Sequence, residues 1–319
     1  MSASAAPPVL PSEGECGLAS WEPADLAALV LPAWDEFIDI AEGVDLDAPT
    51  RLAGWTARHV CVHLGSWPGS RTLDRIRAEA ERDDLDLEDP RAGTFDQESH
   101  NEAVLAARAA APRADVLAAL TEGRAEVASY LSSDQPAALG RRRVRSVLGP
   151  LPLSTLVAAS AYELAVHALD LAPAGARSPS PALLTAGVAA LVDTTGALAA
   201  RGDLTATAAC VPPEGGWAFC STPGAWSTLE LPTVPEGWPA VRGEASVLLD
   251  ASSGRRAVPA LLARRELRLH HVAGLLALAP IVEAVPGLPG GAPLRSAVHN
   301  VRSISRLVRR VPRVPGLPR

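Results

Sequence analysis

Three ionisable residues interrupt the most apolar of the predicted long helices. In the stretch ASAYELAVHALDLA, Glu163 and His167 are four residues apart, and Asp170 follows His167 by three. On a helix, such side chains project from one face with Cβ atoms about 5–6 Å apart. Where that face is buried among Leu, Ala and Val, a carboxylate and an imidazole must be hydrogen-bonded, neutralised or bound to a metal.

A second pair with the same spacing occurs earlier, where His59 and His63 are also four residues apart. If both pairs face the interior of one helical bundle, His63, Glu163 and His167 can converge on one cation. Two imidazoles and a carboxylate with an open position form a catalytic zinc site, and bundle cores often hold such sites. The alternative is structural: Glu163 and His167 form only a hydrogen-bonded pair, and His63 is a core or surface histidine whose hydrogen bonds are made by other groups.

The elements that must position these residues are helical. Apolar residues at three- and four-residue steps predict four long helices, with a kink or division at Pro32 and an interruption at Pro112. The helices are expected at residues 22–40, 54–63, 97–131 and 153–171. The acidic run at 79–89 is interpreted as a solvated helix end and loop. We therefore predict a four-helix bundle over residues 20–172.

The rest of the chain has a different character. Residues 1–19 are small, Pro-rich and Gly-rich, which predicts a flexible tail, and the Pro- and Ser-rich segment 173–182 indicates a linker. Residues 183–290 combine a helix with strand-like pieces and predict a smaller α+β domain, so the fold class is mostly α. Residues 291–319 predict a basic amphipathic tail, which either packs on its own domain or makes a weak contact with anionic lipid or a partner.

Composition excludes several function classes. The 319 residues carry a net charge of −7, which argues against nucleic-acid binding, and all 29 basic residues are arginines. Without lysine there is no Schiff-base chemistry and no phosphate-binding Gly-Lys-Ser/Thr loop. The four cysteines show no C-x-x-C pairing, and neither a signal peptide nor a transmembrane segment is predicted. We therefore expect a soluble, cytoplasmic protein.

Two motifs resemble one known family. The segments GWTARHVCVHLGSW at 54–67 and YELAVHALDL at 162–171 are similar to those of the mycothiol-dependent maleylpyruvate isomerase family. The resemblance implies a DinB-like metal-binding four-helix bundle. It implies that His63, Glu163 and His167 bind zinc or another divalent metal. It also implies that His59 and Asp170 support the ligands or orient the helices.

The second half carries a weaker match. The segment VRGEASVLLDASSGR at 241–255 is similar to the family segment that places a Gly-Arg near the active site. On that match Arg255 is a catalytic residue that reaches the cleft and binds a substrate carboxylate. The chain departs from the family in reading LLDASSGRR there and in continuing to residue 319, so the substrate is not identified. The alternative is that Arg255 and Arg256 form an exposed pair at a helix end.

The resemblance implies a zinc enzyme with mycothiol as its thiol cosubstrate. A thiolate held at the metal would act on a small electrophilic substrate, either in cis–trans isomerisation or in S-transfer. Two alternatives stay open. One is a non-catalytic, regulatory protein that binds metal, and the other is a structural bundle without metal.

Overall fold

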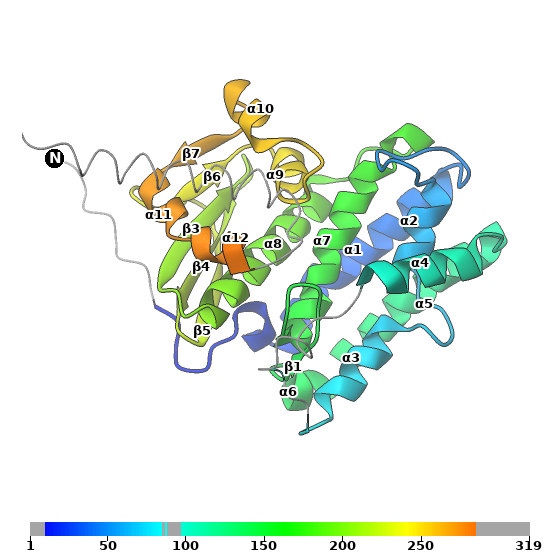
Figure 1. Ribbon diagram of the computed structural model, residues 1–319, viewed down its shortest axis with the longest axis horizontal. Coiled ribbons are helices and arrows are strands. Elements are labelled where there is room, and N and C mark those ends of the chain that lie inside the picture. The colour runs from blue at the N-terminus through cyan, green and yellow to red at the C-terminus, as the bar shows by residue number, and fades with distance from the viewer. Residues whose placement is uncertain (1–9, 85–86, 88–96, 285–319) are drawn as a thin grey trace, which may run out of the picture.

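The computed structural model describes residues 10–84, 87 and 97–284. Its first half is helical, and its second half adds a sheet flanked by further helices, as Figure 1 shows. The predicted fold class, a helical bundle followed by a smaller α+β part, is confirmed.

The helical half is built around four helices, α1 (Pro23–Gly43), α2 (Ala57–Leu64), α5 (Arg113–Leu131) and α7 (Leu153–Asp170). Shorter elements fill the connections between them. These are α3 (Thr72–Ala80), α4 (Gln97–Arg108), α6 (Gln135–Leu139) and the two-residue strands β1 (Arg143–Val144) and β2 (Leu151–Pro152).

Proline positions explain two helix boundaries. Pro112 is the N-cap residue of α5, so the third predicted helix is two helices, α4 and α5. Pro32 lies inside α1 without ending it, because Val30, Phe37 and Ile40 are buried on both sides of it. Tertiary packing of an apolar face outweighs the loss of one backbone hydrogen bond here.

The second half begins with α8 (Pro181–Arg201), which packs against both α7 and the sheet. The sheet has the order β5-β4-β3-β6-β7, in which β6 is parallel to β3 and the other pairs are antiparallel. Its strands are β3 (Ala206–Val211), β4 (Gly216–Thr222), β5 (Ala225–Leu231), β6 (Ala240–Arg242) and β7 (Arg268–His270). The remaining helices are α9 (Ala245–Ser252), α10 (Val258–Ala263), α11 (Val272–Leu276) and α12 (Ala279–Ala284).

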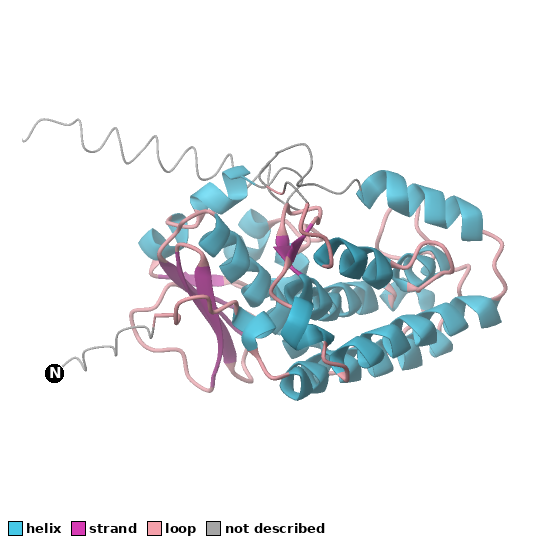
Figure 2. Ribbon diagram, turned by 90° about the horizontal axis from the view of Figure 1, so that it is seen from below, coloured by secondary structure: helices cyan, strands magenta, loops and turns pink. Residues whose placement is uncertain are grey.

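The interface between the two halves is helical. Figure 1 shows α8 between α7 and the strands, and Figure 2 shows most of the strands gathered at one end of the molecule with helices beside them. The apolar faces of the bundle and the sheet share one core. Helix α8 is long and apolar enough to cross a membrane, but 67% of its most apolar window is buried. In this structure it is a core helix.

One sequence prediction is wrong over the described residues, and another holds only in part. The predicted flexible tail includes the 3-10 helix η1 (Gly17–Ser20), in which Leu18 is fully buried. The acidic run contains the end of α3 and exposed residues after it, as predicted, but its first residue is not solvated. Glu79 is 5% exposed and forms ion pairs with Arg75 and Arg145. In both cases the burial depends on a contact from a distant part of the chain, with Asp193 at the Leu18 amide and with Arg145 at Glu79.

The predicted linker at 173–182 is a short connection between two packed helices. Residues 172–174 form a 3-10 turn, and Ser180 caps α8 by accepting a hydrogen bond from the Leu183 amide. The segment therefore does not space two separate bodies, since α7 and α8 pack against each other directly. The predicted basic tail at 291–319 lies outside the described residues.

Candidate metal centre

The start of α2 orients the first histidine pair. Thr56 is the N-cap residue, and its backbone amide donates to Nδ1 of His59 over 2.9 Å. The Thr56 hydroxyl lies 3.0 Å from the same nitrogen. His59 therefore closes a capping box at the start of α2, and His63 lies one turn further along the helix.

The structure brings His63, Glu163 and His167 together. Glu163 Oε2 lies 3.5 Å from His167 Nε2 and 3.9 Å from His63 Nε2. The three residues come from two helices that lie about 100 residues apart in the sequence. Each residue nevertheless offers one ligand atom, and these three atoms lie within 4.8 Å of one another. The side chain of Glu163 is 49% exposed, whereas that of His167 is 7% exposed. The cluster therefore has one side open to solvent.

The donor set and its spacing fit a zinc ion. Two atoms that share a zinc at about 2.1 Å are at most about 4.2 Å apart. The two distances between Glu163 and the histidines fall within that limit. The ligand nitrogens of the two histidines lie within 4.8 Å of each other. Two imidazole nitrogens and one carboxylate oxygen are also the ligands that catalytic zinc sites use when a fourth position stays open.

A carboxylate orients the second of these histidines. Nδ1 of His167 lies 3.0 Å from Oδ2 of the fully buried Asp170. Asp170 in turn accepts two hydrogen bonds from Arg255, from Nε over 3.1 Å and from Nη2 over 2.8 Å. A carboxylate on the far nitrogen fixes the tautomer and orientation of a metal-binding histidine.

Charges at the cluster favour a cation there. Burial opposes the charge on Glu163, but the neighbouring imidazoles of His167 and His63 outweigh burial and lower the pKa of Glu163. Burial also opposes the charge on His167, but Asp170 and Glu163 outweigh it and raise the pKa of that imidazole. A positive charge between two carboxylates is therefore stabilised, and a divalent ion would supply it in place of the proton.

His63 has fewer hydrogen bonds to orient its ring than His167 has. Its Nδ1 is buried and has no hydrogen-bond partner among the described residues. Its ring instead packs edge-on against Trp55, with the ring centroids 5.7 Å apart and an interplanar angle of 71°. The Trp55 ring also stacks on His167, with centroids 6.5 Å apart and an interplanar angle of 5°. Aromatic packing by Trp55 therefore restrains both imidazoles.

The structure places the remaining sequence-predicted residues at two different positions. Asp170 contacts a candidate ligand directly, whereas His59 bonds Thr56 and packs at 6.2 Å against Trp55. Within the described part of the chain, no hydrogen bond joins His59 to a candidate ligand, so His59 orients the helix. Arg255 reaches the centre through Asp170, and its binding of a substrate carboxylate stays a prediction.

Three contributors were not predicted from the sequence. Trp55 packs against both candidate histidine ligands, and the contact between Arg51 and Asp250, 2.6 Å long, joins residues that are far apart in the chain. The only sequence signal was indirect, because Trp55 and Asp250 lie within the segments that resemble the family.

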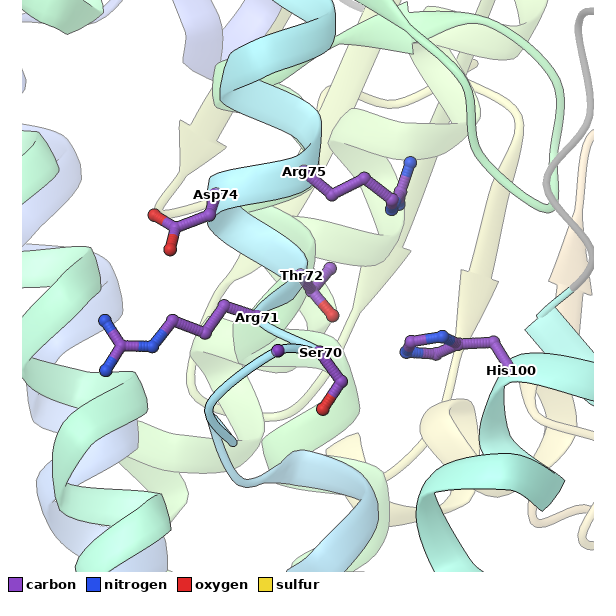
Figure 3. A pocket seen from close by; sticks show the side chains of 7 residues that line it. Ser70, Arg71, Thr72, Asp74, Arg75 and His100 are labelled. Carbon is purple, nitrogen blue, oxygen red and sulfur yellow. The ribbon is translucent and has the colours of Figure 1, made fainter. Parts of the chain in front are cut away.

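A separate cavity of about 540 Å³ lies at the start of α3 and opens toward His100 of α4. Figure 3 shows Arg71 and Asp74 on one side of this helix and Thr72 and Arg75 on the other. Both arginines form ion pairs with glutamates, Arg71 with Glu122 and Glu126 and Arg75 with Glu79. None of the three candidate ligands lines the cavity, so we place the functional site at the histidine cluster instead.

Comparison with known proteins identifies the helical half. The family model described as the mycothiol maleylpyruvate isomerase N-terminal domain matches residues 30–172. Two solved structures, the mycothiol-dependent maleylpyruvate isomerase and a histidine-to-alanine mutant of it, are each 15% identical to this chain. Each comparison covers 75% of this chain and 92% of the other, with a TM-score of 0.45. No match was found among curated proteins. Residues 30–172 thus match the mycothiol maleylpyruvate isomerase N-terminal domain family, which is the resemblance that the two sequence motifs predicted.

Proposed function

We propose that this protein is a zinc-dependent enzyme that uses mycothiol to act on a small electrophilic substrate. The observation that carries the proposal is the convergence of His63, Glu163 and His167 within a domain of this family. The open side of the cluster, at the half-exposed Glu163, gives a small thiol access to it.

The roles of the residues follow from their chemistry. His63, Glu163 and His167 would hold the ion, and a zinc ion bound there lowers the pKa of a coordinated thiol so that a thiolate is present at neutral pH. Asp170 keeps His167 oriented by accepting the hydrogen bond from Nδ1. Zinc binding requires the neutral imidazole, so the ion replaces the proton that the two carboxylates otherwise stabilise on His167.

Arg255 is the proposed contact for a substrate anion. A guanidinium has five N–H donors, of which three are engaged, two with Asp170 and one with the carbonyl oxygen of Ser253. The side chain is 21% exposed. The remaining donors are available to a carboxylate that approaches from the open side of the cluster.

The reaction would be a reversible or a permanent addition of the thiolate. For isomerisation, the sulfur adds to a conjugated carbon and the double bond becomes a single bond about which the substrate rotates. The carbon–sulfur bond then breaks, the trans double bond forms and the thiolate is released. For S-transfer, the sulfur displaces a leaving group or the adduct is protonated, and the thiol stays attached to the product.

The test is a thiol-dependence assay on the purified protein. We expect isomerisation of maleylpyruvate, or conjugation of a panel of small electrophiles, to require mycothiol, to be lost with a zinc chelator and to be absent in His167→Ala. Zinc binding without affinity for mycothiol and without turnover of any substrate would contradict the proposal and favour a regulatory metal-binding protein.

A further inference from the structure

Arg51 contacts two separate segments that border the candidate metal centre. Its backbone amide donates to the carbonyl oxygen of Asp170, at the end of α7, over 3.0 Å. Its Nη2 donates to Oδ1 of Asp250, on α9, over 2.6 Å. Arg51 thus connects the loop before α2 to the helix that carries two candidate ligands and to the α/β half.

The loop that contains Arg51 ends at Trp55. Thr50 donates to the Trp55 carbonyl oxygen from its amide over 3.0 Å and from its hydroxyl over 2.9 Å. The Trp55 amide donates to the carbonyl oxygen of Leu52 over 3.1 Å. These bonds make residues 50–55 one compact unit, so that anchoring Arg51 also fixes the indole of Trp55.

The partner of Arg51 belongs to the segment that leads to Arg255. Asp250 is followed by Ser252, whose hydroxyl lies 3.2 Å from that of Tyr162, and by Arg255, which bonds Asp170. Side-chain exposure is 27% for Arg51 and 10% for Asp250. An ion pair that is this well shielded from solvent is screened less than a surface pair.

We propose that Arg51 is a positioning residue of the metal centre. Through Asp250 and the Asp170 carbonyl, it places the Trp55 indole against His63 and His167 and fixes the segment that carries Arg255. Its effect on metal binding rests on the proposed function, whereas its placement of Trp55 does not.

The form of the contact predicts which substitutions matter. Only Nη2 of the guanidinium contacts Asp250, so a lysine ammonium can replace that interaction at this position. Arg51→Gln instead leaves the buried Asp250 carboxylate without its charge partner. The Trp55 indole is then free to move away from His63, whose Nδ1 has no hydrogen bond to hold the ring.

The experiment compares Arg51→Gln, Arg51→Lys and Asp250→Asn with the wild-type protein. Trp55→Phe identifies the Trp55 contribution to the near-ultraviolet circular dichroism, which is measured without metal. Cobalt(II) titration, followed by visible absorption, measures metal affinity. Arg124→Gln is the control, because it removes the ion pair of Arg124 with Asp35, which is of similar length, 2.9 Å, but exposed.

We expect Arg51→Gln and Asp250→Asn to lose the Trp55 signal and to bind cobalt about ten-fold more weakly, the effect of losing an outer support of a metal site. Arg51→Lys should restore both, and Arg124→Gln should change neither. A wild-type Trp55 signal in Arg51→Gln would overturn the proposal. If that variant does not fold, Asp250→Asn decides in the same way. If the wild-type protein binds no cobalt, the proposed function fails and the Trp55 signal still decides the role of Arg51.

Discussion

Asp170 and Asp193 are both fully buried, but they lie in different chemical surroundings. Asp170 ends α7 beside the candidate metal centre. Asp193 lies on α8 and faces η1 and strand β5. Burial acts on both carboxyl groups in the same direction, since it disfavours the charged form.

The pKa values of the two carboxyl groups shift in opposite directions because their hydrogen-bond partners differ. At Asp170, hydrogen bonds from His167 and Arg255 and their positive charges outweigh burial and lower the pKa. At Asp193, where three neutral groups donate hydrogen bonds, burial outweighs the neutral donors and raises the pKa to about 6. Those donors are the Leu18 amide, the Trp226 indole and the Thr228 hydroxyl. A cationic partner, rather than the number of hydrogen bonds, therefore decides whether the pKa of a buried carboxyl group is lowered or raised.

The largest expected effect comes from neutralising Asp170. Asp170→Asn leaves the Arg255 guanidinium without its charge partner, and breaking a buried ion pair in this way costs about 3–5 kcal/mol of stability. It also removes the acceptor that orients His167, so metal affinity should fall by about 10–100-fold. Urea unfolding and competition with a metal indicator measure the two effects. Wild-type metal affinity in this variant would show that Asp170 does not support the site.

Neutralising Asp193 should have a pH-dependent effect. The folded-state pKa of about 6 lies above the ordinary value of 3.8, so this carboxyl contributes stability that is fully present below the lower value and is lost as pH rises through the higher one. Relative to Asp193→Asn, the wild-type free energy of unfolding should fall by up to about 3 kcal/mol between about pH 4 and pH 7. Urea titrations at several pH values measure this difference. A constant difference between the two proteins would contradict the raised pKa.

Removing the arginine instead of the aspartate should have a smaller effect. In Arg255→Gln, Asp170 keeps His167 as a partner, so we expect a loss of about 2 kcal/mol, typical of hydrogen bonds to a charged group. Metal should still bind, because His167 keeps its acceptor. Calorimetric unfolding and metal titration check this, and Arg255→Lys is the charge-preserving control. A loss of metal equal to that in Asp170→Asn would show that Arg255 acts on the ligands more directly.

The smallest effect is expected at His59. His59→Ala removes one side of the capping box of α2, which should cost about 1 kcal/mol of stability. Metal affinity should not change, since His59 bonds Thr56 and not a candidate ligand. Thermal unfolding and metal titration of the variant test both statements. A clear loss of metal affinity would mean that His59 supports the centre as well as the helix.

The sequence predicted the parts of the centre that lie on one periodic element. The four-residue spacing of Glu163 and His167 on an apolar helix was enough to place both on one face, and Asp170 followed from the same helix. The contact of Arg51 with Asp250 spans 199 residues, and no periodicity connects a loop to a distant helix. The burial of Leu18 was not predicted for a related reason: its segment is ordered by the hydrogen bond that the Leu18 amide donates to the buried Asp193, and it has no helical pattern of its own.

The central claim is that His63, Glu163 and His167 bind one zinc ion. The most direct test is the zinc content of the purified protein, measured by elemental mass spectrometry beside His63→Ala, Glu163→Ala and the control His59→Ala. We expect about one zinc per chain in the wild-type protein and in His59→Ala, and none in the other two variants. A wild-type protein that holds no zinc even after incubation with the ion would contradict zinc binding by these three residues and leave a structural helical bundle.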